Sequence, residues 1–306
     1  MAISAKDVME LRKQTDCGMM ECKKALTDAE GDFAKAIELL RERGLATAAK
    51  KAGRVAAEGM VYADYCAECK VGVVIEVNAE TDFVAKNDKF VEFVKEVSKV
   101  IMQQNPADVE ALMGCKMGEG TVDDALKQLI LVIKENIKVR RFVRYEGPCA
   151  AYVHGGGTHA VLVNFETSDD VAAKAEFAAY GKDIAMQIAA ANPSYLDEAS
   201  VPAEVVAKEK EIMLVQMAGD PKTANKPEAV KVKMIEGKMK KYYKENCLVD
   251  QEFVKDSDLS VAQYTAKVAK ELGGDIKIVK FTRFQKGEGL EKRSDDFASE
   301  VASMVK

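Results

Sequence analysis

Few residues in this chain could do chemistry with their own side chains, and the thiols of Cys66 and Cys69 come first. They form the only CxxC pair, a spacing that supplies half of a structural zinc site. The best second pair, Cys17 and Cys22, has a different spacing and lies in a helical pattern, so we expect no metal site. We interpret Cys66 and Cys69 as small side chains that flank a hairpin turn. The seven cysteines are scattered and odd in number, which indicates reduced thiols.

Acid–base or nucleophilic catalysis also has little to build on. His154 and His159 are the only histidines, and both lie beside the glycine turn 155–157. The sequence contains no phosphate loop, dinucleotide turn, nucleophile elbow or HExxH motif. An enzyme built on Cys66, Cys69 or His154 would need a pocket with a perturbed thiol or imidazole. We therefore expect a protein that is not an enzyme and that needs no cofactor.

The segment Thr81-Asp82-Phe83-Val84 lies between a predicted strand and a predicted helix. One interpretation is a core phenylalanine, with Thr81 or Asp82 capping the helix. The alternative is an exposed Phe83 that anchors a protein partner. The related position 87 residues later is Asp170, and a charge there indicates that the site lies near the surface.

Two other groups could contact a partner. Met19 and Met20 follow a glycine turn, and adjacent helical residues cannot both face inward, so we expect one in the core and one as an adaptable contact. Lys50, Lys51 and Arg54 form a basic connector that could contact an acidic partner or RNA. A solvated connector is the simpler interpretation.

Hydrophobic periodicity predicts the elements that position these residues. Apolar side chains at helical spacing predict three short helices over residues 4–43, with turns at Gly18 and Gly31 and an end at Gly44. Strands are expected at 60–65 and 70–78. The helix that follows carries Phe90 and Ile101 and stops before Pro106.

The pattern of two strands and a helix then recurs. Strands are expected at 150–154 and 159–165, followed by a helix that stops before Pro193. The pairs that match at a constant offset of 87 residues are Phe90 with Phe177, Ile101 with Ile188, and Pro106 with Pro193. We infer an internal duplication, in which each half is a hairpin packed against a helix.

The rest of the chain alternates between helices and one strand. An amphipathic helix is expected at 121–137, between the two halves. Residues 203–246 predict two charged helices joined by a loop with Pro221 and Pro227, which would form a protruding antiparallel hairpin. A helix at 260–272, a strand at 276–284, a turn at 287–289 and a helix from 294 complete the chain, and we expect this end to rejoin the second half.

Composition limits the class of partner. The chain has 306 residues and is 48% hydrophobic, which is enough for two or three domains. Its 50 acidic against 45 basic side chains give no general attraction for nucleic acid. An RNA-binding protein that uses Arg140, Arg141 and Arg144 is the rival interpretation, and it would show a steep salt dependence. Apolar runs such as 129–133 are too short for a membrane, and the first residues lack a signal-peptide pattern, so we expect a cytoplasmic protein.

Two long segments resemble the elongation factor Ts family. Residues 16–26, DCGMMECKKAL, are similar to the family signature GAGMMDCKKAL, and residues 76–88, EVNAETDFVAKND, to a second signature. Shorter matches follow at 50–52, 135–137, 140–141, 152–155, 287–289 and 296–301. Departures from the family pattern are Cys17 for alanine, Lys134 for glycine, Glu252 for proline, and a longer loop at 219–227.

The resemblance implies a fold of α+β class with several parts. An N-terminal three-helix domain of ubiquitin-associated (UBA-like) type would span 1–54, including the basic connector. A core of two related hairpin-plus-helix subdomains would span 55–148, and 149–202 with 247–290. A projecting antiparallel helical hairpin would span 203–246, and a C-terminal helix 291–306.

The resemblance also implies a function, namely guanine nucleotide exchange on elongation factor Tu, a GTPase of translation elongation. The N-terminal module and first core half would grip the nucleotide domain of that partner, and the second half its last domain. Asp82 and Phe83 would push in beside the magnesium site, with Thr81 and Val84 in the same turn. Further partner contacts would be Met19, Met20, His154 and Phe297. No direct contact with nucleic acid or membrane is implied, and a homodimer or a 2:2 complex is left open.

Overall fold

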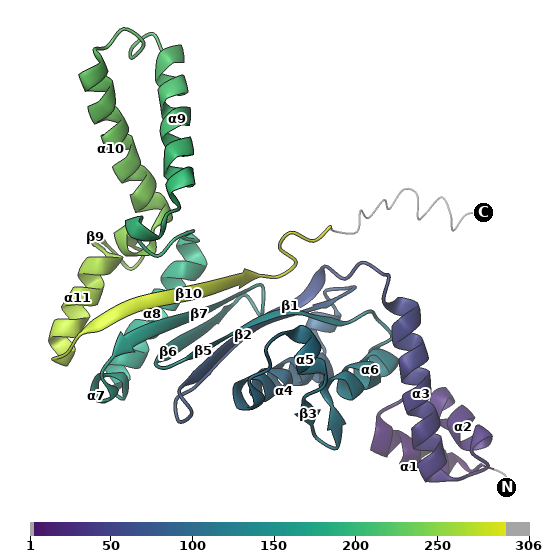
Figure 1. The fold of residues 1–306 in the computed structure, drawn as a ribbon. Helices are drawn as coiled ribbons and strands as arrows, with labels where there is room; N and C mark the ends of the chain where they lie inside the picture. The colour runs from purple at the N-terminus through teal and green to yellow at the C-terminus, as the bar shows by residue number, and fades with distance from the viewer. Residues whose placement is uncertain (1–2, 292–306) are drawn as a thin grey trace.

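The computed structural model describes residues 3–291. Helices and small antiparallel sheets make up these residues, which confirms the expected α+β class (Figure 1). The sheets form the middle of the molecule, with the N-terminal helices at one end and a helical hairpin projecting at the other. The helix expected from residue 294, with Phe297, lies outside the described residues.

Three helices form the N-terminal module, as predicted: α1 (Ala5–Thr15), α2 (Met19–Asp28) and α3 (Phe33–Lys51). Leu11, Leu26 and Leu40 are buried between them. The expected end at Gly44 is wrong, because α3 continues to Lys51. Gly44 instead lets α3 approach α6 closely, since a Cβ there would lie 3.3 Å from the Lys127 carbonyl oxygen. Lys50 is therefore helical, and the UBA-like assignment stays a prediction.

The first sheet has the order β1-β2-β5 and is antiparallel, with β1 at Glu58–Cys66, β2 at Val71–Ala79 and β5 at Lys138–Glu146. The central strand β2 is buried along its whole length. Helices α4 (Asp88–Gln104) and α6 (Val122–Ile133) pack on this sheet through one apolar cluster, which includes Ile75, Phe90 and Ile130. The amphipathic helix expected at 121–137 is thus confirmed but shorter, and β5 was not predicted.

The second sheet repeats this arrangement in the order β10-β7-β6, with β6 at Cys149–His154, β7 at His159–Thr167 and β10 at Ile276–Gln285. In both sheets the second hairpin strand is central. Helix α8 (Ala175–Ala191) has 17 residues, like α4, and begins 87 residues after it. Both helices end at a left-handed asparagine, Asn105 with φ 48° and Asn192 with φ 47°. The bounds of these two helices therefore repeat at the offset of 87 residues that the sequence shows, and those of the central strands β2 and β7 repeat at 88.

The two sheets pack against each other through a second apolar cluster, which includes Val61, Val74, Leu162 and Phe284. Gly72 lets the two sheets approach closely, because a Cβ there would be 2.6 Å from the Leu162 side chain. As expected, the strand near the end of the chain rejoins the second half, since β10 pairs with β7. The shorter elements nearby are η1 (Val84–Lys86), α5 (Val109–Met113), β3 (Lys116–Met117), β4 (Gly120–Thr121) and α7 (Asp169–Ala172).

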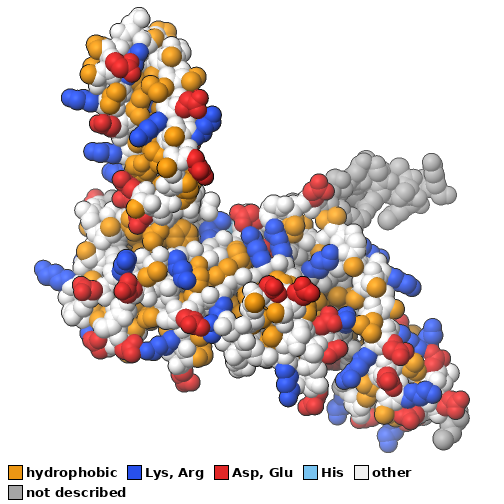
Figure 2. All heavy atoms as spheres, in the orientation of Figure 1, with side chains coloured by type: hydrophobic (Ala, Val, Ile, Leu, Met, Phe, Trp, Pro, Cys, Tyr) orange, Lys and Arg blue, Asp and Glu red, His pale blue; other side chains and the backbone are white. Residues whose placement is uncertain are grey.

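Helices α9 (Ala203–Gly219) and α10 (Glu228–Asn246) form the predicted antiparallel hairpin, which projects from the second half (Figure 1). Met217, Ile235 and Met239 are buried between the two helices, and Figure 2 shows hydrophobic side chains along the seam. The base of the hairpin adjoins η2 (Glu198–Ser200), η3 (Leu248–Asp250), β8 (Glu252–Phe253), β9 (Asp256–Ser260) and α11 (Val261–Leu272). None of the described helices is long and apolar enough to cross a membrane.

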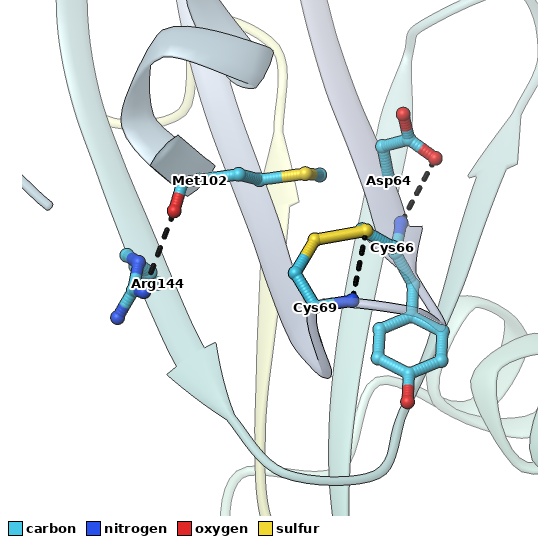
Figure 3. Close-up of a disulfide and its surroundings, with 6 residues drawn as sticks. Asp64, Cys66, Cys69, Met102 and Arg144 are labelled. Atoms are coloured by element: carbon cyan, nitrogen blue, oxygen red, sulfur yellow. Dashed lines mark hydrogen bonds between the residues drawn. A yellow bond between two sulfur atoms is a disulfide. The ribbon is translucent and has the colours of Figure 1, made fainter. Parts of the chain in front are cut away.

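Cys66 and Cys69 lie at the turn between β1 and β2, as expected, but they are joined in a disulfide (Figure 3). The expectation of reduced thiols is therefore wrong for this pair. The tight turn brings their Cα atoms to 5.5 Å, within the range that a disulfide bridges. The remaining cysteines are free thiols. The Cys69 N–H also donates a hydrogen bond to the Cys66 Sγ at 3.2 Å.

Candidate protein-binding site at the Phe83 turn

Residues 81–84, which we call the Phe83 turn, connect β2 to the short helix η1. The Phe83 ring is 80% exposed, whereas the next side chain, Val84, is 6% exposed and belongs to the core under α4. The interpretation of Phe83 as a core residue is therefore wrong, and the interpretation as an exposed aromatic side chain is confirmed. Helix capping by Thr81 or Asp82 is also wrong, because Asn87 accepts the capping bond from the Lys89 N–H of α4.

A second loop, residues 134–136 between α6 and β5, holds the Phe83 turn. The Glu135 carboxylate accepts hydrogen bonds from the Thr81 N–H at 2.9 Å and from the Thr81 hydroxyl at 2.6 Å. In return, the Glu80 carboxylate accepts from the Asn136 N–H at 2.6 Å. Each loop thus supplies one glutamate that satisfies a backbone donor of the other loop.

No role was predicted for Glu80 or Glu135, although residues 135–137 formed one of the shorter family matches. A glutamate in a loop is usually solvated, and no local pattern shows that its partner lies more than fifty residues away. The Asp82 carboxylate beside Phe83 is exposed, as is Asp170 in the second half. The surface location inferred from Asp170 is thus correct for both positions.

Met19 and Met20 lie in the first turn of α2, and both are exposed, by 49% and 75%. The expectation that one of them is in the core is wrong. The buried stripe of α2 is formed by Cys22, Ala25 and Leu26, so it begins beyond the two methionines. Both side chains are therefore available to a partner.

His154 is exposed at the end of β6, and its Nδ1 lies 3.0 Å from the Tyr152 hydroxyl. His159 is paired opposite to it on β7. Burial lowers the pKa of His159, and the nearby positive charge of Arg283 lowers it further. The two imidazoles therefore lie opposite each other at the end of the β6–β7 hairpin.

The three arginines of the rival RNA-binding interpretation are engaged within the fold. Arg140 and Arg141 on β5 both form ion pairs with the fully buried Glu76 of β2, at 3.0 and 2.6 Å. Arg144 pairs with Glu146 at 2.6 Å and donates to the carbonyl of Met102 (Figure 3). These side chains stabilise the sheet, so the basic segment is not a free patch for phosphate groups.

The described residues offer weak support for an active site. Burial raises the pKa values of the Cys149 and Cys247 thiols to about 11, which disfavours the reactive thiolate. An open groove of about 590 Å³ lies between the N-terminal module and helices α4 and α6, and its lining within the described chain contains neither cysteine nor histidine. Within residues 3–291, no cluster of three or more His, Cys, Asp or Glu side chains could hold a metal ion.

Comparison with known proteins identifies the family of this chain. The family model described as Elongation factor TS matches residues 80–288. The chain belongs to the elongation factor Ts family. It is 48% identical to Elongation factor Ts of Clostridium perfringens (strain 13 / Type A), over 99% of both chains. It is also 48% identical to Elongation factor Ts of Syntrophotalea carbinolica over 100% of both chains, and 46% identical to that of Clostridioides difficile over 99% of both.

The elongation factor Ts match includes most of the candidate surface. The family model begins at Glu80, so it covers the whole Phe83 turn, the loop with Glu135, and His154. Met19 and Met20 precede the matched segment, but the similarity to the full-length relatives extends over them. The candidate residues thus belong to the part of the chain that carries the family likeness.

Proposed function

We propose that this chain is a guanine nucleotide exchange factor for elongation factor Tu, and that it acts in translation elongation in the cytoplasm. In this proposal it binds the GDP form of that GTPase, disturbs the Mg²⁺ site of the partner and promotes release of GDP. The observation that carries the proposal is Phe83, an 80% exposed aromatic side chain on a turn held by hydrogen bonds, in a chain of the elongation factor Ts family.

Exchange of this kind requires no catalytic side chain. The factor needs only to bind the nucleotide-free partner more tightly than the nucleotide-bound partner, because linkage then weakens nucleotide binding by the same factor. Weakening by about a thousandfold corresponds to roughly 4 kcal/mol of differential binding. A buried aromatic anchor supplies about 2 kcal/mol or more, so Phe83 could account for about half of this requirement.

Magnesium explains why a single turn can have a large effect. The metal bridges phosphate oxygens and neutralises their charge in GTPase sites, so displacing it removes much of what holds the nucleotide. In our proposal the Phe83 ring inserts beside that site and the exposed carboxylate of Asp82 disturbs its coordination. Thr81 and Val84 support the same turn from the inside.

The rest of this difference in binding free energy must come from other contacts with the partner, which we place on several parts of the chain. The proposed division is residues 1–54, 55–148, 149–202 with 247–290, 203–246 and 291–306. Met19 and Met20 would contact the partner from the first part, His154 from the third and Phe297 from the last. Contacts from several parts of the chain would together supply the binding energy that the Phe83 turn alone does not.

Stopped-flow release of a fluorescent GDP analogue from purified elongation factor Tu tests the proposal. We expect strong acceleration by this protein when Mg²⁺ is present. In EDTA, release without the factor is already fast, so the acceleration should shrink. The absence of acceleration with Mg²⁺ would overturn the exchange function, and equal acceleration in both conditions would overturn only the part played by the metal.

A further inference from the structure

Two loops from separate parts of the chain bind each other beside Phe83. One loop contains Glu80 and Thr81 at the end of β2, and the other contains Glu135 and Asn136 between α6 and β5. Glu135 accepts from both the N–H and the hydroxyl of Thr81, and Glu80 accepts from the Asn136 N–H. We call this set of contacts the glutamate clasp.

A second layer of contacts fixes the clasp to the rest of the fold. Asn136 is 2% exposed, and its side-chain amide donates to the Arg54 carbonyl at 2.7 Å. The Glu80 carboxylate also pairs with the Arg54 guanidinium at 3.4 Å. Neither loop therefore depends on a single contact for its position.

The clasp divides the Phe83 turn into anchored and free side chains. The N–H and the hydroxyl of the half-buried Thr81 both donate to Glu135, so the Thr81 side chain is held against the second loop. Val84 is buried on the other side of Phe83, in the core under α4. Only Asp82 and Phe83 project from the turn, and they lie between two fixed points.

We propose that Glu135 is a positioning residue, which holds the Phe83 turn in its binding conformation before a partner arrives. The inference rests on the proposed exchange function and assigns Thr81 to internal support instead of partner contact. A partner that meets an ordered ring does not have to order it, and this preorganisation increases affinity without adding a contact. Glu135 would therefore influence exchange without touching elongation factor Tu.

A fluorescence measurement tests the ordering without any partner. The chain contains no tryptophan, so Phe83→Trp introduces a single indole at the turn. We expect its anisotropy to fall clearly when Glu135→Ala or Thr81→Val is added, because each removes part of the clasp. Thr81→Ser keeps the hydroxyl and should preserve the anisotropy. Unchanged anisotropy in both clasp variants would overturn the inference.

A second experiment shows whether the ordering matters for exchange. We expect Glu135→Ala to slow GDP release from elongation factor Tu about tenfold, which equals about 1.4 kcal/mol. In the Phe83→Ala background, the same substitution should change the rate by less than twofold, since a positioning residue has nothing left to position. Full tenfold losses in both backgrounds would show that Glu135 acts separately and would overturn the inference.

Controls separate this inference from general damage and from failure of the proposed function. Glu68→Ala removes an exposed glutamate at the other end of the same hairpin, and it should change neither anisotropy nor release. Thermal melts identify a clasp variant that unfolds, in which case Thr81→Val replaces Glu135→Ala in both experiments. If the parent protein does not accelerate GDP release, the exchange proposal fails, whereas the anisotropy still decides whether Glu135 orders the turn.

Discussion

Phe83 and Phe90 lie close together in the sequence but in opposite environments. Phe90 is fully buried under the first sheet, whereas Phe83 is largely exposed. The helical spacing of apolar residues predicted the place of Phe90, because it is one of a periodic set on α4. Phe83 has no such set, and Val84 takes the core position beside it. The sequence left two interpretations of Phe83 open because local pattern does not reveal which of two adjacent apolar residues fills the core.

Lys134 has a backbone conformation that is unusual for a residue with a side chain. It ends α6 in the left-handed conformation, with φ 65°, where side chains with a Cβ are strained. Lys134→Gly should stabilise the fold by about 0.5–1 kcal/mol, because relief of that strain exceeds the added freedom of the unfolded chain. Urea unfolding measures the difference. Lys134→Ala retains the Cβ and should show no such gain, and an equal gain in both variants would contradict the explanation.

Among the elements, α4 and α8 could be predicted from apolar residues at helical spacing, and β2 and β7 from short, nearly continuous apolar runs. Strand β5 could not be predicted, because its arginines gave residues 138–146 the pattern of an exposed basic segment. The physical reason is tertiary: Arg140 and Arg141 pair with Glu76 on the neighbouring strand, which no local pattern shows. Glu135 was missed for the same reason, because its partner Thr81 lies on another element.

The hairpin of β1 and β2 provides a prediction for an element. With Cys66 and Cys69 joined, the denatured protein should show five free thiols before reduction and seven after it. The count needs denaturant, because burial raises the pKa of the Cys149 and Cys247 thiols to about 11 and slows their reaction. Seven thiols before reduction would contradict the disulfide.

The free energy of unfolding tests the same disulfide in a second way. Because the closed loop is so short, the disulfide should contribute at most about 2 kcal/mol. Urea unfolding of the double variant Cys66→Ser/Cys69→Ser measures this difference, and the variant should show five thiols with and without reductant. A much larger loss would mean that the hairpin end supports more of the fold than its position indicates.

Over the whole molecule, the buried carboxylate of Glu76 connects the two halves. It accepts from Arg140, from Arg141 and from the N–H of Gly287, which follows β10 of the second sheet. Arg141 also lies over the ring of Phe284 on β10, at 4.2 Å. A glycine is required at 287, because its φ is 68° and a Cβ would lie 2.3 Å from the Ala57 carbonyl oxygen. The end of β10 is thereby fixed to the first sheet.

Removing this carboxylate should affect the whole fold. Glu76→Ala should lower the free energy of unfolding by about 3 kcal/mol, because Arg140 loses its buried counter-charge and Arg141 keeps only its more exposed partner, Glu288. Urea unfolding measures the loss. Glu146→Ala, which removes the exposed partner of Arg144, is the matched control and should cost less than about 1 kcal/mol. Equal and small losses in both variants would show that the buried cluster does not connect the halves.

In our proposal, the exposed Phe83 side chain weakens nucleotide binding by elongation factor Tu. The decisive test is the release of a fluorescent GDP analogue from elongation factor Tu, followed by stopped flow with the parent, Phe83→Ala and Val254→Ala. Val254→Ala serves as the control, because Val254 is also an exposed apolar side chain, at 52%, and lies at the turn between β8 and β9.

We predict that Phe83→Ala slows release about 30-fold or more, as loss of about 2 kcal/mol requires, whereas Val254→Ala changes it less than twofold. Both variants should keep their free energy of unfolding within about 0.5 kcal/mol of the parent, because both positions are exposed. GDP release that is as fast with Phe83→Ala as with the parent would overturn the role of Phe83. A loss of about 3 kcal/mol of stability in that variant would also overturn it, because a loss of that size is typical of a core phenylalanine.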